Sequence, residues 1–200
     1  MRWDNLFDDL EGQLEQELSA EELDVRAEEE RLRLARLTIR DRILAVDDAQ
    51  PRGSHYSVRV FLADGSVISV RPVTVGRDWF SADVVDDSTR TSQCIIPIAA
   101  IASIALTREQ LTSSLAGDEA DARRAPLPAR LSLAFVLRDL CRRRATVELR
   151  TPTGVLRGTI DRVGRDHLDL AIHEAGEPRR DASVSQSRIV PLAQVVLVRL

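Results

Sequence analysis

The tetrapeptide V-G-R-D occurs twice in this chain of 200 residues, at residues 75–78 and 163–166. Each copy lies between apolar segments of similar pattern, VTVGRDWFSADV in the first and IDRVGRDHLDLA in the second. The similarity extends in both directions, with an offset of 88 residues at V-G-R-D and 94 residues at either end, and such extension distinguishes an internal repeat from a coincidence. The sequence therefore predicts two related units, residues 35–106 and 129–200.

Alternating apolar residues predict that both units consist mainly of β-strands. Apolar and polar residues alternate over residues 58–62, and the Asp64-Gly65 pair that follows is typical of a hairpin turn. The second unit follows the same plan, with ATVELR, a P-T-G turn and VLRGTIDRV. We expect Gly76 and Gly164 of the two V-G-R-D copies to turn the chain again, because glycine takes a positive φ at little cost.

The remainder of each unit completes a small all-β plan. After V-G-R-D there is a third strand, a polar loop, and an apolar segment that a proline interrupts before the last strand. Five short strands with a tight turn before the fifth predict a strongly bent barrel. In the second unit the preceding segment SLAFVLRDLCRRR predicts a short helix with Ser132 as its N-cap. We expect a mainly β protein with α, consisting of two tandem five-stranded bent barrels, each preceded by a short helix.

Two further segments lie outside the predicted barrels. Residues 1–34 are acidic and carry apolar residues at steps of three and four, which predicts an amphipathic helix. Residues 107–128 separate the two units. There, Thr107 and Gln110 form a predicted capping box that begins a short helix, and a linker follows.

Charge and hydropathy limit the class of protein. The net charge of −4 is divided as about −7 over residues 1–36, −3 over 37–120 and +6 over 121–200. The longest apolar run, residues 94–106, is interrupted by a proline and is too short to span a bilayer. The N-terminus is acidic where a secretory signal would be basic. We therefore expect a cytoplasmic protein that has no membrane partner.

In the second unit, a short helix precedes VELRTPTGVLRGTIDRVGRDHLDLAI, a variable loop and a final pair of strands. This order resembles the Sm-like (Hfq/LSm-type) family of small barrels, and residues 158–170 are similar to the first motif of that family. The apolar places of the motif are filled by Ile160, Val163, Leu168 and Leu170. The resemblance implies two tandem Sm-like or SH3-like barrels, and an RNA site in which His167 stands near the base-stacking position. Asp169 occupies the place of the family's asparagine, and a carboxylate is repelled by phosphate.

Basic residues of the second unit are candidates for contacts with nucleic acid. The segment CRRR ends a predicted helix, where arginines either offset the helix dipole or bind phosphate. The candidate nucleic-acid-binding residues are Arg142, Arg143, Arg144, Arg157, Arg162, Arg165 and His167. RNA binding requires these side chains to form a continuous basic surface.

The acidic N-terminal segment carries the candidate residues for binding a protein partner. These residues form the apolar stripe Trp3, Leu6, Phe7, Leu10 and Leu14. The stripe could dock on the chain's own barrels and complete their cores, or it could be a ligand for a groove on another protein. The sequence leaves both alternatives open.

No segment has the pattern of a catalytic, cofactor-binding or metal-binding site. The chain lacks a Ser/His/Asp order with an elbow glycine, and it lacks a phosphate-binding glycine loop. Cys94 and Cys141 stand alone in apolar surroundings, which indicates buried side chains rather than a disulfide or a metal site. We therefore predict a non-catalytic adaptor or regulatory protein with an unidentified protein partner. The alternative is binding of RNA or other nucleic acid through the second barrel, and the oligomeric state stays open.

Overall fold

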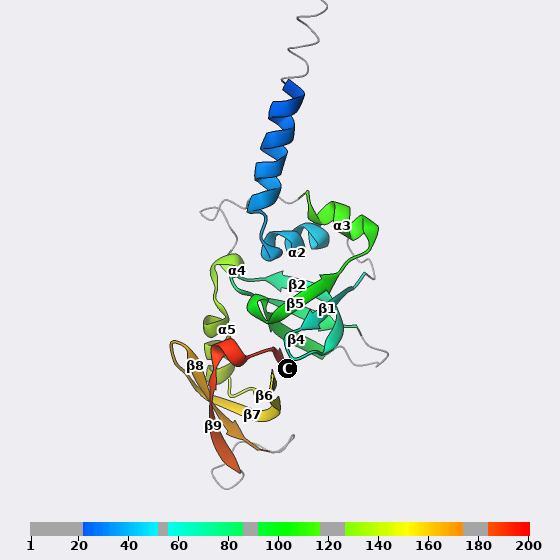
Figure 1. Ribbon diagram of the computed structural model, residues 1–200. Helices are drawn as coiled ribbons and strands as arrows, with labels where there is room; N and C mark the ends of the chain where they lie inside the picture. The colour runs from blue at the N-terminus through cyan, green and yellow to red at the C-terminus, as the bar shows by residue number, and fades with distance from the viewer. Residues whose placement is uncertain (1–21, 52–55, 86–91, 117–126, 174–183) are drawn as a thin grey trace, which may run out of the picture. The chain divides into compact units, whose positions relative to one another are not determined.

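The computed structural model describes residues 22–51, 56–85, 92–116, 127–173 and 184–200 (Figure 1). The chain divides into two compact units, Met1–Thr38 and Ile39–Leu200.

The described part of the first unit is a helix over residues 22–36. Ion pairs three or four residues apart lie along it, including Arg26 with Glu22 at 3.4 Å and Arg33 with Glu30 at 2.7 Å. The predicted partner-binding residues all lie outside the described residues, and these are Trp3, Leu6, Phe7, Leu10 and Leu14.

The second unit holds the β-strands. In chain order its first part contains α2 (Ile39–Asp48), β1 (Val58–Leu62), β2 (Val67–Val75), β3 (Trp79–Val84), β4 (Ser92–Pro97), η1 (Ile98–Ala100), β5 (Ile101–Ala105) and α3 (Arg108–Ser114). Its second part contains α4 (Leu127–Arg130), α5 (Leu133–Arg142), β6 (Thr146–Thr151), β7 (Gly154–Val163), β8 (His167–Ile172), β9 (Gln186–Pro191), η2 (Leu192–Gln194) and β10 (Leu197–Arg199). The prediction of a mainly β protein with α is confirmed.

All ten strands belong to one antiparallel sheet, in the order β5-β1-β2-β3-β4-β10-β6-β7-β8-β9. We call the strands β1 to β5 the first half-sheet and β6 to β10 the second half-sheet. The fourth strand of the first half-sheet pairs with β10 of the second, so the hydrogen bonding among the described residues forms an open sheet with β5 and β9 as its edge strands. The expectation of two tandem barrels therefore stays a prediction.

The second strand of each half-sheet contains an irregularity in the same place. The register of β2 against β3 shifts between Pro72 and Thr74, and that of β7 against β8 shifts between Ile160 and Arg162. Such a bulge bends a strand and lets its two ends pair with different neighbours. In β2 this irregularity falls at Pro72, and it leaves Val73 exposed.

The first hairpin of each half-sheet turns at a glycine, as predicted. Gly65 has φ +82° and Gly154 has φ +136°, which are backbone conformations that side chains with a Cβ disfavour.

The expected reason for the V-G-R-D glycines is wrong, because neither Gly76 nor Gly164 has a positive φ. Instead, an aromatic ring three residues later lies over each of them. A Cβ on Gly76 would stand 2.2 Å from the indole Nε1 of Trp79, and one on Gly164 would stand 2.6 Å from Cε1 of His167. Each glycine N–H donates to the carbonyl of that same aromatic residue at 2.8 Å. The glycine is needed for space rather than for backbone freedom.

The two half-sheets have separate cores that exchange residues. The first core lies among β1 to β4 and α2, and it includes Leu197, the first residue of β10, and Val196 just before that strand. The second core lies among α5 and β6 to β9, and Trp79 and Ile95 of the first half-sheet belong to it. Because each core includes residues of the other half, the two halves fold as one body.

Helices α2 and α3 lie side by side over the first half-sheet (Figure 1). The predicted capping box of α3 is confirmed, since the Thr107 hydroxyl accepts from the Gln110 backbone N–H and the Gln110 side chain accepts from the Thr107 N–H. Arg42 of α2 donates to the Ser114 hydroxyl at 2.9 Å, which ties the two helices together. Within the described residues, every helix is too short or too polar to cross a membrane.

Candidate functional site

The two half-sheets join where the edge strand β4 of the first pairs with the edge strand β10 of the second. We call this pairing the junction. Strand β4 runs antiparallel to β10, with Ile95 opposite Val198 and Cys94 opposite Arg199. The Leu200 N–H extends this pairing by donating to the Gln93 carbonyl at 3.0 Å. The backbone of one half-sheet edge is thereby satisfied by the other.

The first V-G-R-D turn holds the start of α5 at this junction. The Arg77 N–H and the Trp79 indole Nε1–H both donate to the Leu131 carbonyl at 3.0 Å. The Asp78 carboxylate accepts from the Leu133 N–H at 2.7 Å. Ser132 is the N-cap residue as predicted, but its side chain makes no capping hydrogen bond. A carboxylate from the other half-sheet caps α5 instead.

Two apolar side chains of the first half-sheet fill the space between α5 and β10. Ile95 is 4% exposed and Trp79 is 6% exposed. They pack in one cluster with Leu133 and Leu137 of α5 and with Val198 of β10. Trp79 is therefore part of the core of the second half-sheet.

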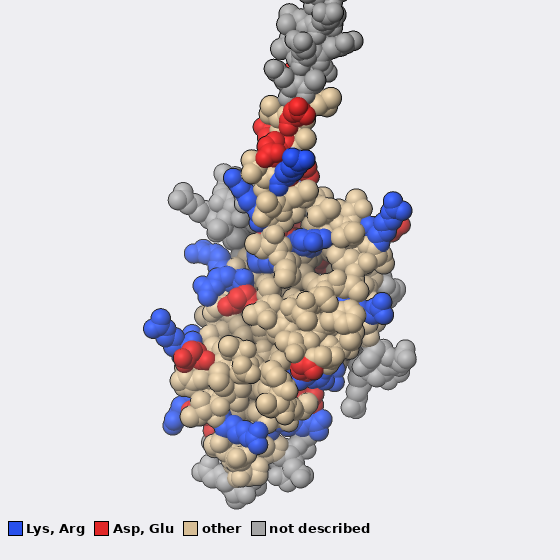
Figure 2. Space-filling model, in the orientation of Figure 1, with Lys and Arg blue, Asp and Glu red and all other residues tan. Residues whose placement is uncertain are grey.

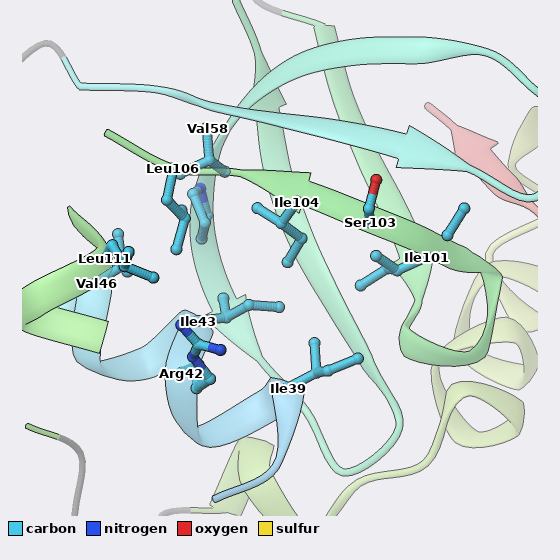
Figure 3. Close-up of a pocket in the computed structure, with 12 residues that line it drawn as sticks. Ile39, Arg42, Ile43, Val46, Val58, Ile101, Ser103, Ile104, Leu106 and Leu111 are labelled. Carbon is cyan, nitrogen blue, oxygen red and sulfur yellow. The ribbon is translucent and has the colours of Figure 1, made fainter. Parts of the chain in front are cut away.

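The corresponding space in the first half-sheet, between α2 and β5, is an open groove of about 390 Å³. Figure 3 shows apolar side chains of both elements pointing into it. They include Ile39 and Ile43 of α2 and Ile101 and Ile104 of β5. Arg42 also lines the groove, and its guanidinium donates a hydrogen bond to the Ser114 hydroxyl. The groove is therefore an apolar surface beside a free strand edge.

At the other free edge of the sheet, β9 exposes a large apolar side chain. Ile189 is 73% exposed, the largest exposure among the described bulky apolar residues. Beside it, the second V-G-R-D turn is exposed to solvent, with Asp166 accepting from His167 Nδ1 at 2.8 Å. This hydrogen bond lowers the pKa of Asp166 below its usual value, so the carboxylate is ionised at neutral pH.

Most of the candidate nucleic-acid-binding residues are paired with carboxylates. The ion pairs are Arg142 and Arg143 with Asp139, Arg144 with Asp161, Arg157 with Glu148, and Arg162 with Asp169. His167 is hydrogen-bonded to the Asp166 carboxylate. Arg165 is exposed in the turn between β7 and β8. On the face shown in Figure 2, arginines are interspersed with carboxylates and separated by uncharged surface.

The structure brings two of these residues together with an arginine that sequence analysis did not single out. Arg144, Arg162 and Arg188 line a polar pocket of about 500 Å³ beside β7, β8 and β9. Asp161 and Asp169 line the same pocket and pair with Arg144 and Arg162. Two of its three arginines therefore already have counter-charges, and Arg188 donates to the Gln186 side chain at 2.9 Å.

Sequence analysis also missed the apolar residues at the two free edges. The signal was present in the alignment of the two units, where Ile189 stands at the place of Ile95 and Ile39 at the place of Leu133. What the alignment cannot show is that β4 is an internal strand whereas β9 is an edge strand. A pattern of apolar residues is the same in both positions.

Among the described residues, no three His, Cys, Asp or Glu side chains converge in the way that a metal site requires. Comparisons of the chain with protein-family models, with curated proteins and with solved structures found no match.

Proposed function

We propose that this chain is a non-catalytic cytoplasmic binding protein, an adaptor or regulatory protein built from two tandem Sm-like barrels. Its binding surface for protein is the groove between α2 and β5. The observation that carries this proposal is the contrast between two equivalent spaces. The space beside α5 is filled by Trp79 and Ile95, whereas the space beside α2 is open and apolar.

The chemistry of the groove favours a protein ligand. Isoleucine side chains of α2 and β5 offer contact to an aliphatic or aromatic side chain, and a volume of about 390 Å³ accommodates one or two of them. The edge of β5 adds backbone groups that the described strands leave unpaired, and such groups bind an extended peptide by strand addition. An apolar anchor on an extended strand is therefore the expected ligand class.

A phage-displayed library of random peptides, selected on the immobilised full chain, tests this proposal. Selected peptides should share a large apolar residue, and their binding to Ile39→Asp should fall at least about tenfold, since the substitution places a charge in the apolar groove. The matched control is Val67→Asp, which changes an exposed valine of β2 to the same residue. Peptides that bind both variants equally well would contradict the groove as the binding surface.

Binding of RNA is the second candidate function, and it is supported by the convergence of Arg144, Arg162 and Arg188 in one pocket. Phosphate would have to compete with the two aspartates there. Titration of the full chain with a single-stranded RNA oligonucleotide at about 50 and 200 mM salt tests it. Salt-sensitive binding that Arg188→Ala weakens and Arg59→Ala leaves unchanged would support this function. No salt-sensitive binding would exclude it.

A further inference from the structure

Among the described residues that line the groove, Arg42 is the one that carries a charge. Figure 3 shows it on α2 together with Ile39 and Ile43. Its Nε and Nη2 atoms donate to the Ser114 hydroxyl at 3.2 and 2.9 Å, and it forms no ion pair within the described part of the chain. A guanidinium has more N–H donors than this single neutral acceptor uses. The groove therefore offers a positive charge and N–H donors to whatever covers it.

Two other partly buried arginines in the same part of the fold have carboxylate partners. Arg40 lies 3.4 Å from Asp41 and also donates to the Gly76 carbonyl at 2.8 Å. Arg71 lies 2.7 Å from Asp83. Arg42 differs from both, since its acceptor is a hydroxyl. Burial of a charge without a counter-charge is costly, so a ligand that covers Arg42 binds better if it supplies an anion.

At the filled space beside α5, the position equivalent to Arg42 is apolar. In the alignment of the two units, Val136 stands at the place of Arg42, and Leu133 stands at the place of Ile39. Val136 packs against the cluster that contains Trp79. Both helices have ten residues, so the arginine distinguishes the open groove from the filled space although the two helices match in length. A ligand of the groove meets a cation where the occupant of the filled space meets a valine.

The segment that fills the space beside α5 combines a carboxylate with an apolar ring. Asp78 and Trp79 are adjacent in sequence. The Asp78 carboxylate accepts from the Leu133 N–H at 2.7 Å, and the Trp79 side chain is 6% exposed in the cluster beside it. On α2, Ile39 and Arg42 are three residues apart and therefore lie on one face of the helix. A ligand that imitates this arrangement brings its carboxylate close to the Arg42 guanidinium.

We propose that the groove binds a segment of a partner protein in which an aspartate or glutamate lies within two residues of the large apolar anchor. The anchor packs between Ile39 and Ile104, and the acidic side chain accepts a charge-assisted hydrogen bond from Arg42. In an extended segment, side chains two positions apart point to the same side and are about 7 Å apart, so both reach the groove. This inference rests on the proposed function, because it uses the same groove.

Arg42 determines specificity through the cost of covering it. A wholly apolar ligand removes water from the guanidinium and leaves it with the Ser114 hydroxyl as its acceptor. A ligand carboxylate offsets this loss, whereas a lysine or arginine at the same place adds repulsion between like charges. The groove therefore selects acidic segments against apolar and basic ones.

The peptides selected from a random library on the full chain provide the first test. Aspartate and glutamate should be enriched within two positions of the apolar anchor, and basic residues should be depleted there. One selected acidic peptide is then synthesised with a fluorescein label and titrated with the full chain. Replacing its acidic residue by the corresponding amide should lower the affinity about tenfold, because the hydrogen bond to Arg42 loses its charged acceptor.

Variants at Arg42 identify the partner of that acidic residue. Arg42→Gln should lower the affinity for the acidic peptide about tenfold, while the amide peptide should bind the wild type and the variant about equally. Arg42→Glu should reverse the preference, so that a peptide with lysine in place of the acidic residue binds more tightly than the acidic peptide. The matched control is Arg59→Glu, the same change on the exposed side of β1. It should retain the wild-type preference. A reversed preference is not imitated by loss of folding.

Equal binding of the acidic and amide peptides to the wild type would overturn the inference, as would a preference that Arg42→Glu leaves unchanged. The proposed function survives both results if the peptides still require Ile39. It fails, and the inference fails with it, if no selected peptide depends on Ile39.

Two other occupants of the groove would also overturn the assignment to a partner protein. Peptide binding that appears only when Trp3→Ser and Phe7→Ser are introduced would assign the groove to the chain's own N-terminal segment. Association of the full chain in sedimentation velocity that Ile39→Asp abolishes would assign it to a second copy.

Discussion

The Asp78 carboxylate of one half-sheet accepts a hydrogen bond from the Leu133 N–H at the start of α5 in the other, at 2.7 Å. A helix capped from a neighbouring part of the fold depends on that part for its stability. The capping residue is 55 positions before the helix in sequence, so local sequence does not identify it.

Replacing this cap should destabilise the chain. We expect Asp78→Ala to lower the free energy of unfolding by about 1 kcal/mol, because it leaves the Leu133 N–H without its acceptor. Asp166→Ala is the matched control, since Asp166 occupies the same turn position in the second half-sheet and is 86% exposed. Urea denaturation at low protein concentration measures both. A larger loss from Asp166→Ala than from Asp78→Ala would contradict this role.

The two V-G-R-D glycines should differ in their sensitivity to substitution. Gly76→Ala should cost about 1–3 kcal/mol, because its Cβ collides with a Trp79 ring that is buried and bonded to Leu131. Gly164→Ala should cost less, because the His167 ring is about half exposed and can rotate away. Thermal unfolding of the two variants gives the comparison, and equal losses would count against this explanation of the glycines.

Asp64 should make the junction sensitive to acid. Burial alone would raise its pKa, but two hydrogen bonds from Ser66 and the nearby charge of Arg150 lower it below the usual 3.8. Asp64 lies 3.8 Å from the Arg150 Nε, a buried atom that has no hydrogen-bond acceptor among the described residues. The folded state therefore binds this proton less readily than the unfolded state, and the stabilisation is complete above pH about 4 and lost as pH falls further.

The measurement is the pH dependence of unfolding for the wild type and Asp64→Asn. At pH 7 the variant should be less stable by about 1–2 kcal/mol, because the Arg150 guanidinium loses its anion. The difference should diminish as pH falls through the lowered pKa of Asp64, where the wild-type carboxyl is also neutral. A difference that stays constant down to pH about 2 would show that the carboxylate charge is not the cause.

The thiols should react at very different rates. Burial raises the pKa of Cys94 to about 11, and this side chain is fully buried in β4 opposite Arg199. Cys141 is only partly buried, at the end of α5. Since the thiolate is the reactive form, iodoacetamide at pH 8 should modify Cys141 first, as peptide mass spectrometry will show. Equal rates of modification for Cys94 and Cys141 would contradict a closed junction. Asp78→Ala weakens the junction and should therefore increase the rate at which Cys94 is modified.

Local patterns in the sequence were sufficient to predict the individual strands, turns and helix starts. The hairpin at Gly65, the bulge near Pro72 and the capping box at Thr107 each depend on residues within a few positions of one another. For such features, the backbone preferences of glycine, proline and threonine decide the structure. The same reasoning gave the wrong cause for Gly76, since the constraint there is a ring packed in tertiary structure.

Candidate surfaces were harder to predict because charge and exposure are properties of neighbours in space. The sequence predicts a basic cluster from the arginines of the second half-sheet. In the structure, Asp161 forms an ion pair with Arg144 and Asp169 forms one with Arg162. The sequence pattern around Ile189 is that of any apolar strand residue, but its side chain is the most exposed of the described bulky apolar residues.

By itself, the sequence determined that this is a mainly β protein with two sets of strands in the same order, since alternation and turn residues act locally. Only the tertiary structure decided that β4 pairs with β10, that Trp79 and Ile95 complete a distant core, and that the groove beside Ile39 stays open. Strand pairing and burial depend on which edges meet in space, and identical local patterns are compatible with both a filled and an empty site.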